Sequence, residues 1–168
     1  DNPIIGVAEK PQHYLPVLAD IDLKVKDDSE TEFGEHLYSN ENVSQIIEIY
    51  QSVLRNIVED CKDDNLTCIL LEKPIYYIDI SETIYIKNGF HLHFPNIFLS
   101  KIDQEIHLIP RIQDLVSKHD VFGDLSLENP ESVIDKSCCK VPWLMYGSRK
   151  SEDMDAYKIT KVISSDGS

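Results

Sequence analysis

The sequence has few basic residues and no long apolar run, and both shortages narrow what the protein can be. Its 168 residues contain 16 lysines and arginines against 30 aspartates and glutamates, a formal net charge of −14 at pH 7. Taken alone, this acid excess argues against a nucleic-acid partner, because phosphates would be repelled. The acidic residues are unevenly placed, with clusters in residues 27–35 and 152–155, so the local electrostatic field at a site decides whether nucleic acid can bind. No apolar run approaches the ~20 residues of a membrane helix, and we expect no membrane partner.

Cysteine is also scarce, and its spacing excludes familiar metal modules. The four cysteines are Cys61, Cys68, Cys138 and Cys139. They form neither a C-x-x-C pair nor a recognisable zinc-binding pattern. We therefore expect reduced thiols in a cytosolic protein.

The length fits one domain with a buried core, and we expect a single domain over residues 1–168. The chain starts with Asp1 rather than Met and ends in a polar run of Ser, Asp and Gly. We therefore expect it to be a piece of a longer protein.

Hydrophobic periodicity predicts strands alternating with two long helices. Apolar residues recur at helical spacing from Val43 to Val58, with Asn42 as the expected N-cap. A second helical pattern runs from Leu99 to Val116, and Pro110 inside it should kink or split the helix. This order indicates an α/β or α+β layered fold. The expected strands cover residues 14–24, 66–71, 75–80, 83–94 (interrupted near Asn88-Gly89), 143–146 and 157–163.

Two carboxylates stand one residue apart at the end of the first predicted strand. Because side chains alternate along a strand, Asp20 and Asp22 share one face while Ile21 and its apolar neighbours face the core. Carboxylates held side by side repel each other unless a cation lies between them. Hard divalent cations such as Mg²⁺ take such oxygen ligands together with substrate phosphates. The pair therefore suggests a metal site, although a solvated pair is the simpler interpretation when it is considered alone.

A second polar face is predicted on the strand 83–94. Lys87, Gly89, His91 and His93 share that face, and the intervening residues Phe90, Leu92 and Phe94 point to the core. A cation, a residue that permits close backbone approach and two imidazoles suit an anionic substrate such as a triphosphate. Two alternatives stay open: an H-x-H pair that binds zinc or iron, and a structural role for His93.

Near the C-terminal end, Asp135 follows two apolar residues and is a candidate third carboxylate. Further on, Gly147-Ser148 permits a tight turn whose N–H groups and hydroxyl can meet phosphate oxygens, and Arg149 and Lys150 add positive charge. Taken alone, these residues are better explained as a surface turn with solvated cations and an ordinary exposed aspartate.

The order of these three segments resembles the archaeo-eukaryotic primase superfamily, which carries an hDhD motif, then an sxH motif, then an hD motif (h, hydrophobic; s, small). Asp20 and Asp22 match the first, Gly89-Phe90-His91 the second and Ile134-Asp135 the third. The sequence around His91 and after Trp143 looks like the branch of large cytoplasmic DNA viruses, where a primase domain is fused to a helicase, as in poxvirus and African swine fever virus proteins. The resemblance spans about residues 14 to 163.

The resemblance implies a primase-polymerase catalytic core: an α/β (α+β) domain with a mixed sheet flanked by helices and the active site on the sheet face. It implies a nucleotidyltransferase, a DNA primase that makes primers by two-metal chemistry with Mg²⁺ or Mn²⁺ and releases pyrophosphate. Its partners would be nucleoside triphosphates, a single-stranded DNA template and a C-terminal helicase portion of the same protein, in viral DNA replication in the host cytoplasm. The implied metal ligands are Asp20, Asp22 and Asp135, and the implied nucleotide-binding residues are Lys87, Gly89, His91, Ser148, Arg149 and Lys150.

Some residues depart from the pattern, and two other functional classes stay open. Gly89 lacks the hydroxyl that serine offers in many relatives, Leu144 stands where some relatives have arginine, and no zinc module of the family is visible. One alternative is a non-polymerising metalloenzyme that uses His91, His93 and a carboxylate. The other is a non-catalytic replication module that binds nucleotide or template.

Overall fold

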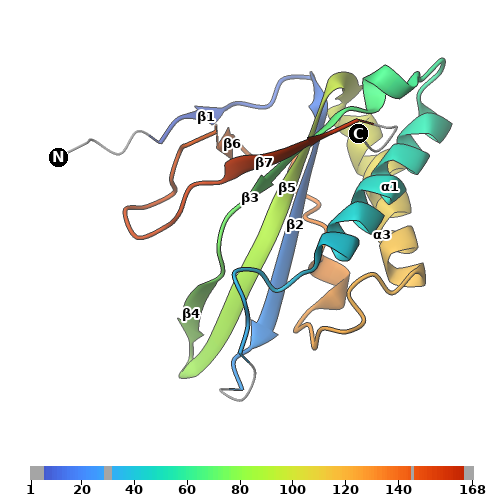
Figure 1. The fold of residues 1–168 in the computed structure, drawn as a ribbon. Helices are drawn as coiled ribbons and strands as arrows, with labels where there is room; N and C mark the ends of the chain where they lie inside the picture. The colour runs from blue at the N-terminus through green and yellow to red at the C-terminus, as the bar shows by residue number, and fades with distance from the viewer. Residues whose placement is uncertain (1–5, 29–31, 145, 165–168) are drawn as a thin grey trace.

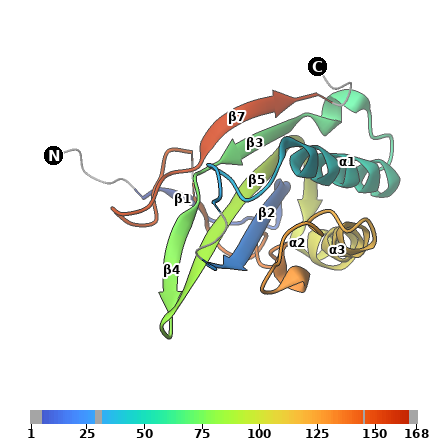
Figure 2. The same cartoon turned by 60° about the horizontal axis from the view of Figure 1, so that its bottom comes forward.

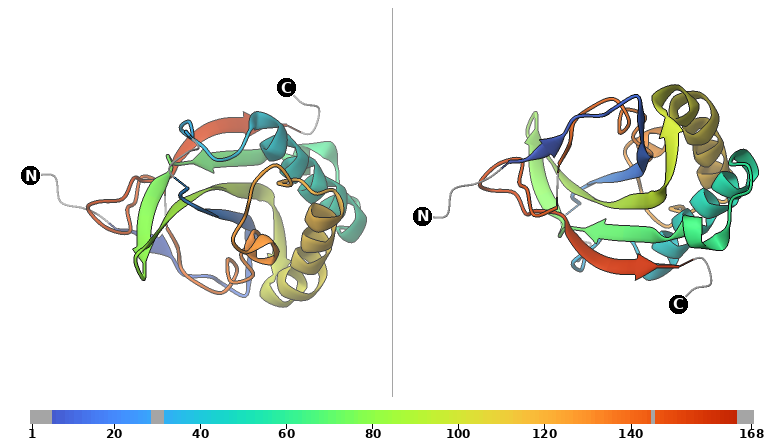
Figure 3. Two further views of the ribbon diagram at one scale, coloured as in Figure 1. Left: turned by 90° about the horizontal axis from the view of Figure 1, so that it is seen from below. Right: turned by 90° about the horizontal axis from the view of Figure 1, so that it is seen from above.

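The computed structural model describes residues 6–28, 32–144 and 146–164. A five-stranded sheet forms the centre, with α1 (Asn40–Ile57) and α3 (Ile109–Lys118) packed on one face (Figure 1). The opposite face carries a small ladder of β1 (Ala8–Glu9) and β6 (Trp143–Leu144), and Figure 3 shows this ladder and the helices on opposite sides of the sheet. The α/β class predicted from the sequence is confirmed.

The sheet is built around two long strands, β2 (Tyr14–Lys26) and β5 (Thr83–Ser100), which pair along most of their length. The strand order is β2-β5-β3-β7, and β4 also pairs with β5. Every pairing in the described part of the chain is antiparallel, so these strands do not form the mixed sheet that the resemblance implied. The remaining strands are β3 (Cys68–Glu72), β4 (Tyr76–Ile80) and β7 (Lys158–Ile163), and the short helical segments are Asp63–Leu66, α2 (Lys101–Asp103), Gln104–Leu108 and Pro130–Ser132.

Alternation along β2 and β5 separates an apolar face from a polar one. Val17, Ala19, Ile21 and Leu23 are fully buried against the helices, while Asp20 on the other face is partly exposed. On β5, the side chains of Phe90, Leu92 and Phe94 belong to the same buried core. Burial of this apolar face is the main force that holds the helices on the sheet.

The predicted interruption of the strand at Asn88-Gly89 is wrong, because β5 runs continuously from Thr83 to Ser100. The Asn88 side chain does not initiate a turn but lies buried, where it accepts a 2.8 Å hydrogen bond from the Leu37 amide and donates one of 3.0 Å to the Lys73 carbonyl. These bonds fix two loops against the strand and satisfy a polar group that would be costly to bury alone.

Helix α1 begins earlier than predicted, with Ser39 rather than Asn42 as its N-cap. The Ser39 hydroxyl accepts a hydrogen bond from the Asn42 amide, and the Asn42 side chain accepts one from the Ser39 amide. This reciprocal arrangement satisfies two N–H groups at the helix start. The Asn42 side chain also donates a 2.6 Å bond to the Val121 carbonyl, so it fastens the helix to the segment after α3.

The second helical region is split, as the proline predicted. A π-helical stretch, Gln104–Leu108, separates α2 from α3, and Pro110 lies in the first turn of α3, where its missing N–H costs nothing. None of the helices in the described residues is long and apolar enough to cross a membrane.

One connection decides how the site is built. Residues 133–135 run antiparallel along the edge of β2, where the Asp22 amide donates to the Val133 carbonyl and the Asp135 amide donates to the Asp20 carbonyl, both at 2.9 Å. This short segment extends the sheet by backbone hydrogen bonds. It thereby brings a distant part of the chain beside the two aspartates of β2.

Candidate active site

A cleft of about 620 Å³ lies on the polar face of the sheet, between the strands and the chain around β1 and β6. Another hollow of about 610 Å³ lies beside α3, but it holds none of the predicted site residues. Of those residues, the cleft is lined by Asp20, Asp22, Lys87, His91, Asp135, Ser148 and Lys150.

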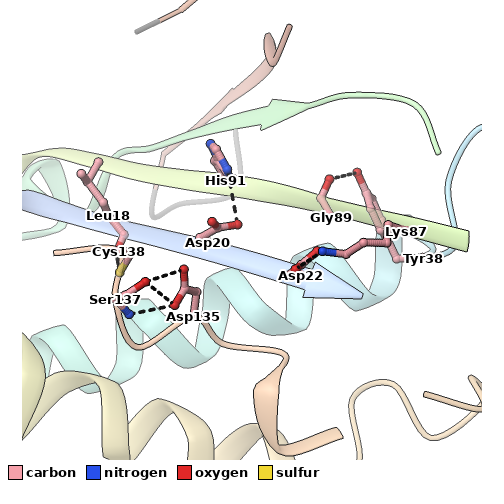
Figure 4. Close-up of polar contacts among 10 residues, drawn as sticks. All are labelled: Leu18, Asp20, Asp22, Tyr38, Lys87, Gly89, His91, Asp135, Ser137 and Cys138. Atoms are coloured by element: carbon pink, nitrogen blue, oxygen red, sulfur yellow. Dashed lines mark hydrogen bonds and ion pairs between the residues drawn. The ribbon is translucent and has the colours of Figure 1, made fainter. Parts of the chain in front are cut away.

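The two aspartates of β2 each face a basic group on β5 (Figure 4). The His91 Nε2 lies 3.3 Å from an Asp20 oxygen, and the Lys87 Nζ lies 2.6 Å from an Asp22 oxygen. The pairing follows from the register. Asp20 stands opposite His91, and Asp22 stands opposite Gly89, which is two residues from Lys87 on the same face. The Asp22 carboxylate raises the pKa of Lys87 against the opposing effect of burial, so this lysine stays charged.

The third carboxylate reaches the same cleft from the edge of the sheet. Asp135 is held there by its backbone bond to Asp20, and its side chain accepts hydrogen bonds from the amide and hydroxyl of Ser137 at 2.8 Å (Figure 4). The next residue, Cys138, is buried against the Leu18 carbonyl, and burial raises the pKa of its thiol to about 12. Cys138 is therefore a neutral structural residue.

Gly89 is required by the close approach of β2. A Cβ atom at this position would lie 2.0 Å from the Ile21 carbonyl oxygen, far inside van der Waals contact. Position 89 therefore has to be glycine unless β2 moves. The carbonyl that it approaches belongs to Ile21, which lies between Asp20 and Asp22. Any side chain at position 89, including the serine found in many relatives, would clash with the Ile21 carbonyl in this fold.

His91 is enclosed by two aromatic rings that the sequence analysis did not single out as site residues. The ring of Tyr157 stacks on it with centroids 3.6 Å apart, and the Trp143 ring lies 4.4 Å away at a tilt. Both aromatic residues come from the C-terminal part of the chain, and only a sheet contact brings them here. They fix the orientation of an imidazole that is itself 8% exposed.

Lys73 is a third residue of the site that sequence patterns did not indicate. It follows β3, and its Nζ lies 4.8 Å from the centroid of the Tyr76 ring and 4.5 Å from that of Tyr157. Burial lowers its pKa, and the negative charges of Asp20 and Asp22 partly offset that effect. No spacing in the sequence marks this lysine, since it reaches the cleft through the bond between its carbonyl and Asn88.

The predicted phosphate-binding turn is only partly brought to the cleft. Ser148 is buried and its hydroxyl accepts a 3.1 Å bond from the Val7 amide, while Lys150 lines the cleft. Arg149 is exposed and is not one of the residues that line the cleft in the described part of the chain. His93 shares the strand face of His91 but likewise stays outside the lining, and burial lowers its pKa.

The donor set suits a hard divalent cation, although the side chains do not converge on one point. Three carboxylates in one cleft are the oxygen ligands that Mg²⁺ or Mn²⁺ takes. In the described residues, no three His, Cys, Asp or Glu side chains stand close enough to hold an ion as they are. Each carboxylate has a protein partner instead: His91, Lys87 or Ser137. Cation binding therefore requires these side chains to exchange partners.

Together, an antiparallel sheet with helices on one face and acidic and basic groups in a cleft on the other form an α/β domain. This architecture is consistent with a primase-polymerase core. Residues 3–163 match the family described as the C962R protein N-terminal AEP domain. The chain belongs to this family of archaeo-eukaryotic primase domains.

Proteins of large DNA viruses are similar over almost the whole chain. "Putative helicase 121R" of Invertebrate iridescent virus 3 is 40% identical over 95% of this chain, and "Putative helicase 184R" of Invertebrate iridescent virus 6 is 38% identical over 95%. "Putative helicase L207/L206" of Acanthamoeba polyphaga mimivirus is 24% identical over 92%. The chain spans only 17%, 18% and 15% of the length of these relatives, respectively.

Proposed function

We propose that this domain synthesises oligonucleotide primers on a single-stranded DNA template by nucleotidyl transfer. The observation that carries the proposal is the backbone pairing of Asp135 with Asp20, which gathers three carboxylates into a cleft that also holds basic side chains. Neutralising a triphosphate and orienting an in-line attack are the main demands of phosphoryl transfer, and both kinds of group serve them.

In this proposal the basic groups bind the incoming nucleoside triphosphate. The ammonium groups of Lys73, Lys87 and Lys150 border the cleft and attract the phosphates, and His91, fixed by its aromatic neighbours, donates a hydrogen bond to a phosphate oxygen. When the triphosphate arrives, it takes Lys87 and His91 away from the aspartates. That exchange frees Asp22 and Asp20 to act as ligands.

Asp20, Asp22 and Asp135 would hold Mg²⁺ or Mn²⁺, which when bound would stabilise charge on the attacking and leaving oxygens. The 3′ hydroxyl oxygen of a nucleotide or primer forms a bond to the α-phosphorus. The bond from that phosphorus to the oxygen that bridges to the β-phosphate breaks, and pyrophosphate leaves. The hydroxyl proton passes to solvent.

The same proposal assigns a place to the domain in a longer protein. Because similar proteins carry the name helicase and are more than five times as long as this chain, a helicase portion would be fused to this domain and would open the duplex that it copies. The relatives belong to viruses, so we place this activity in viral DNA replication, in the host cytoplasm.

The test is a primer-synthesis assay with a single-stranded template, labelled nucleotides and Mg²⁺ or Mn²⁺, followed by sizing of the products. Asp20→Asn and Asp22→Asn should each abolish product while the circular dichroism spectrum stays unchanged. Asp114→Asn removes the same charge from an exposed position on α3 and should be fully active. Product from either β2 variant at the wild-type rate would contradict the proposal. Nucleotide binding without any product from the wild type would favour a non-catalytic module.

A further inference from the structure

The polar face of the sheet does not end at the cleft. Beyond Asp22 the same alternation places Lys24 and Lys26 of β2 on that face, beside Lys87 and Tyr85 of β5. Strand β4 adds Tyr76, which pairs with Lys87. The lysine–tyrosine strip is defined here as Lys24, Lys26, Tyr76, Tyr85 and Lys87.

The strip consists of two neighbouring rows that cross the strands. One row contains Lys24, Lys87 and Tyr76, and the next contains Lys26 and Tyr85. Neighbouring rows are two residues apart along a strand, a rise of about 6.6 Å. The rows follow the Asp22–Gly89 pair directly, so the strip leads away from the carboxylates toward the β4–β5 hairpin (Figure 2).

Aromatic rings and ammonium groups contact each other along the strip. The Lys24 Nζ lies 4.3 Å from the centroid of the Tyr85 ring, and the Tyr76 ring is faced by Lys73 at 4.8 Å. Such cation–π contacts already order both side chains. Little further side-chain entropy is therefore lost when a ligand binds. Lys26 is exposed, and Lys24, Tyr76 and Tyr85 are half-buried, so a ligand can reach each of them.

The charge of the strip differs from that of the whole chain. Three lysines gather here in a protein of net charge −14. Two carboxylates border the strip on this face: Asp22, which is paired with Lys87, and Glu128, which stands opposite Lys24 because its amide donates a 2.9 Å hydrogen bond to the Lys24 carbonyl. Asp79 of the hairpin stands opposite Ile84 and therefore lies on the other face. The strip thus combines three ammonium groups with two aromatic rings beside the proposed nucleotide site, although the chain as a whole is acidic.

We propose that the lysine–tyrosine strip binds the single-stranded DNA template and guides it to the carboxylates. This inference rests on the proposed function, because an enzyme that copies a template needs an unpaired strand beside its carboxylates. Unpaired bases expose faces that stack on tyrosine, and their phosphates pair with lysine, the combination typical of single-strand binding. Lys87 is assigned to the triphosphate, so Lys24 and Lys26 supply the template contacts. With about two phosphate contacts, the logarithm of the binding constant should fall linearly with the logarithm of the salt concentration, with a slope of about −1.4.

The experiment measures fluorescence anisotropy of a fluorescein-labelled 20-nucleotide oligothymidylate with the wild-type chain at increasing salt. Lys24→Gln should make the slope shallower by about 0.7, and Tyr85→Leu should weaken binding at least about fivefold. Lys118→Gln removes the same charge from the exposed end of α3 and should bind as the wild type does. A duplex of the same length should bind more weakly.

Wild-type binding by both strip variants would overturn the inference, as would equal binding of the duplex or no binding by the wild type at low salt. Because Lys24 is only half-buried and lies on the polar face of the sheet, outside the core, its variant decides the matter even if Tyr85→Leu fails to fold. Ultraviolet crosslinking of an oligonucleotide with 5-iododeoxyuridine should label the peptides of Tyr76 or Tyr85. If DNA binds through the strip but the wild type makes no primer, the proposed primer synthesis is wrong and the template-binding role of the strip stands. If the strip variants make primers with the wild-type KM for template, the template-binding role is wrong and primer synthesis stands.

Discussion

The main-chain amide of Asp135 donates a 2.9 Å hydrogen bond to the carbonyl oxygen of Asp20. The two residues belong to distant parts of the sequence, and this bond makes them neighbours at the edge of one sheet. Because the contact uses backbone atoms, their placement does not depend on either side chain. Substitutions at these carboxylates can therefore change the chemistry without moving the chain.

Removing the third carboxylate should weaken cation binding. Asp135→Asn keeps the backbone bond to Asp20 but loses one negative ligand, so we expect the Mn²⁺ concentration for half-maximal activity to rise at least about tenfold. In thermal melts, Mn²⁺ should stabilise the wild type more than this variant. Identical Mn²⁺ responses of the two proteins would show that Asp135 is not a ligand. Chelation of divalent ions should stop activity in both.

A side chain at position 89 should displace β2. Gly89→Ala places a methyl group 2.0 Å from the Ile21 carbonyl oxygen. Relief of this overlap should lower the unfolding free energy, measured by urea titration, by about 1–3 kcal/mol. The displacement of β2 should also abolish nucleotide transfer. Gly34→Ala is the matched control, because its added methyl meets no atom of the described residues within 4 Å. Equal stability of the two variants would mean that β2 and β5 adapt freely at this point.

The capping pair of α1 should contribute measurably to stability. Ser39→Ala removes the acceptor of the Asn42 amide bond and should cost about 1 kcal/mol. Asn42→Ala should cost more, because it also leaves the buried Val121 carbonyl without its donor. Ser44→Ala, at an exposed position inside the helix, should be close to neutral. Chemical denaturation gives all three values, and a neutral Ser39→Ala would contradict the capping assignment.

His93 should make the protein less stable in mild acid. Burial lowers its pKa in the folded state below the ordinary value of 6.5, with Glu9 partly opposing the shift, so the unfolded chain takes up the proton first. The stability due to the neutral ring is therefore complete above about pH 6.5 and is lost as the pH falls through the folded pKa. His93→Gln should flatten this loss in melts between pH 7 and 5. His107→Gln, at an exposed position, should show the same pH dependence of melting as the wild type. If the His93→Gln curve also runs parallel to that of the wild type, His93 is not the source of the acid sensitivity.

Tyr157 should act as a positioning residue for His91. Tyr157→Leu removes the stacked ring 3.6 Å from the imidazole, so we expect KM for the nucleotide to rise about tenfold with a smaller change in kcat. Tyr157→Phe retains the ring and should restore most of the loss. If Phe and Leu behave alike, the hydroxyl rather than the stacked ring is what matters.

Local pattern was enough to predict much of the fold. The apolar alternation that buries Ile21 and exposes Asp22 needs only the two-residue period of a strand, and the proline that splits the second helical region acts within one turn. The pattern was misleading at Asn88-Gly89, where a dipeptide typical of turns lies inside a continuous strand. There, buried hydrogen bonds of Asn88 and the approach of β2 outweigh turn propensity.

The site was only partly readable in the same way. Asp20, Asp22, Lys87 and His91 lie on one face of two strands, and strand periodicity predicts that. Lys73, Trp143 and Tyr157 enter the cleft through loops and a bulged edge strand, and no spacing marks them. Arg149 was predicted to join the phosphate-binding residues, but its side chain is exposed outside the cleft lining.

By itself the sequence determined which residues share a strand face and where the two helical regions lie, because these follow from side-chain periodicity. Only the tertiary structure decided that Asp135 lies beside Asp20, that His91 is enclosed by Tyr157, and that lysines and tyrosines of three strands form one strip. The reason is that strand register and edge pairing depend on backbone hydrogen bonds between segments far apart in the chain, and such bonds leave no periodic trace in the sequence.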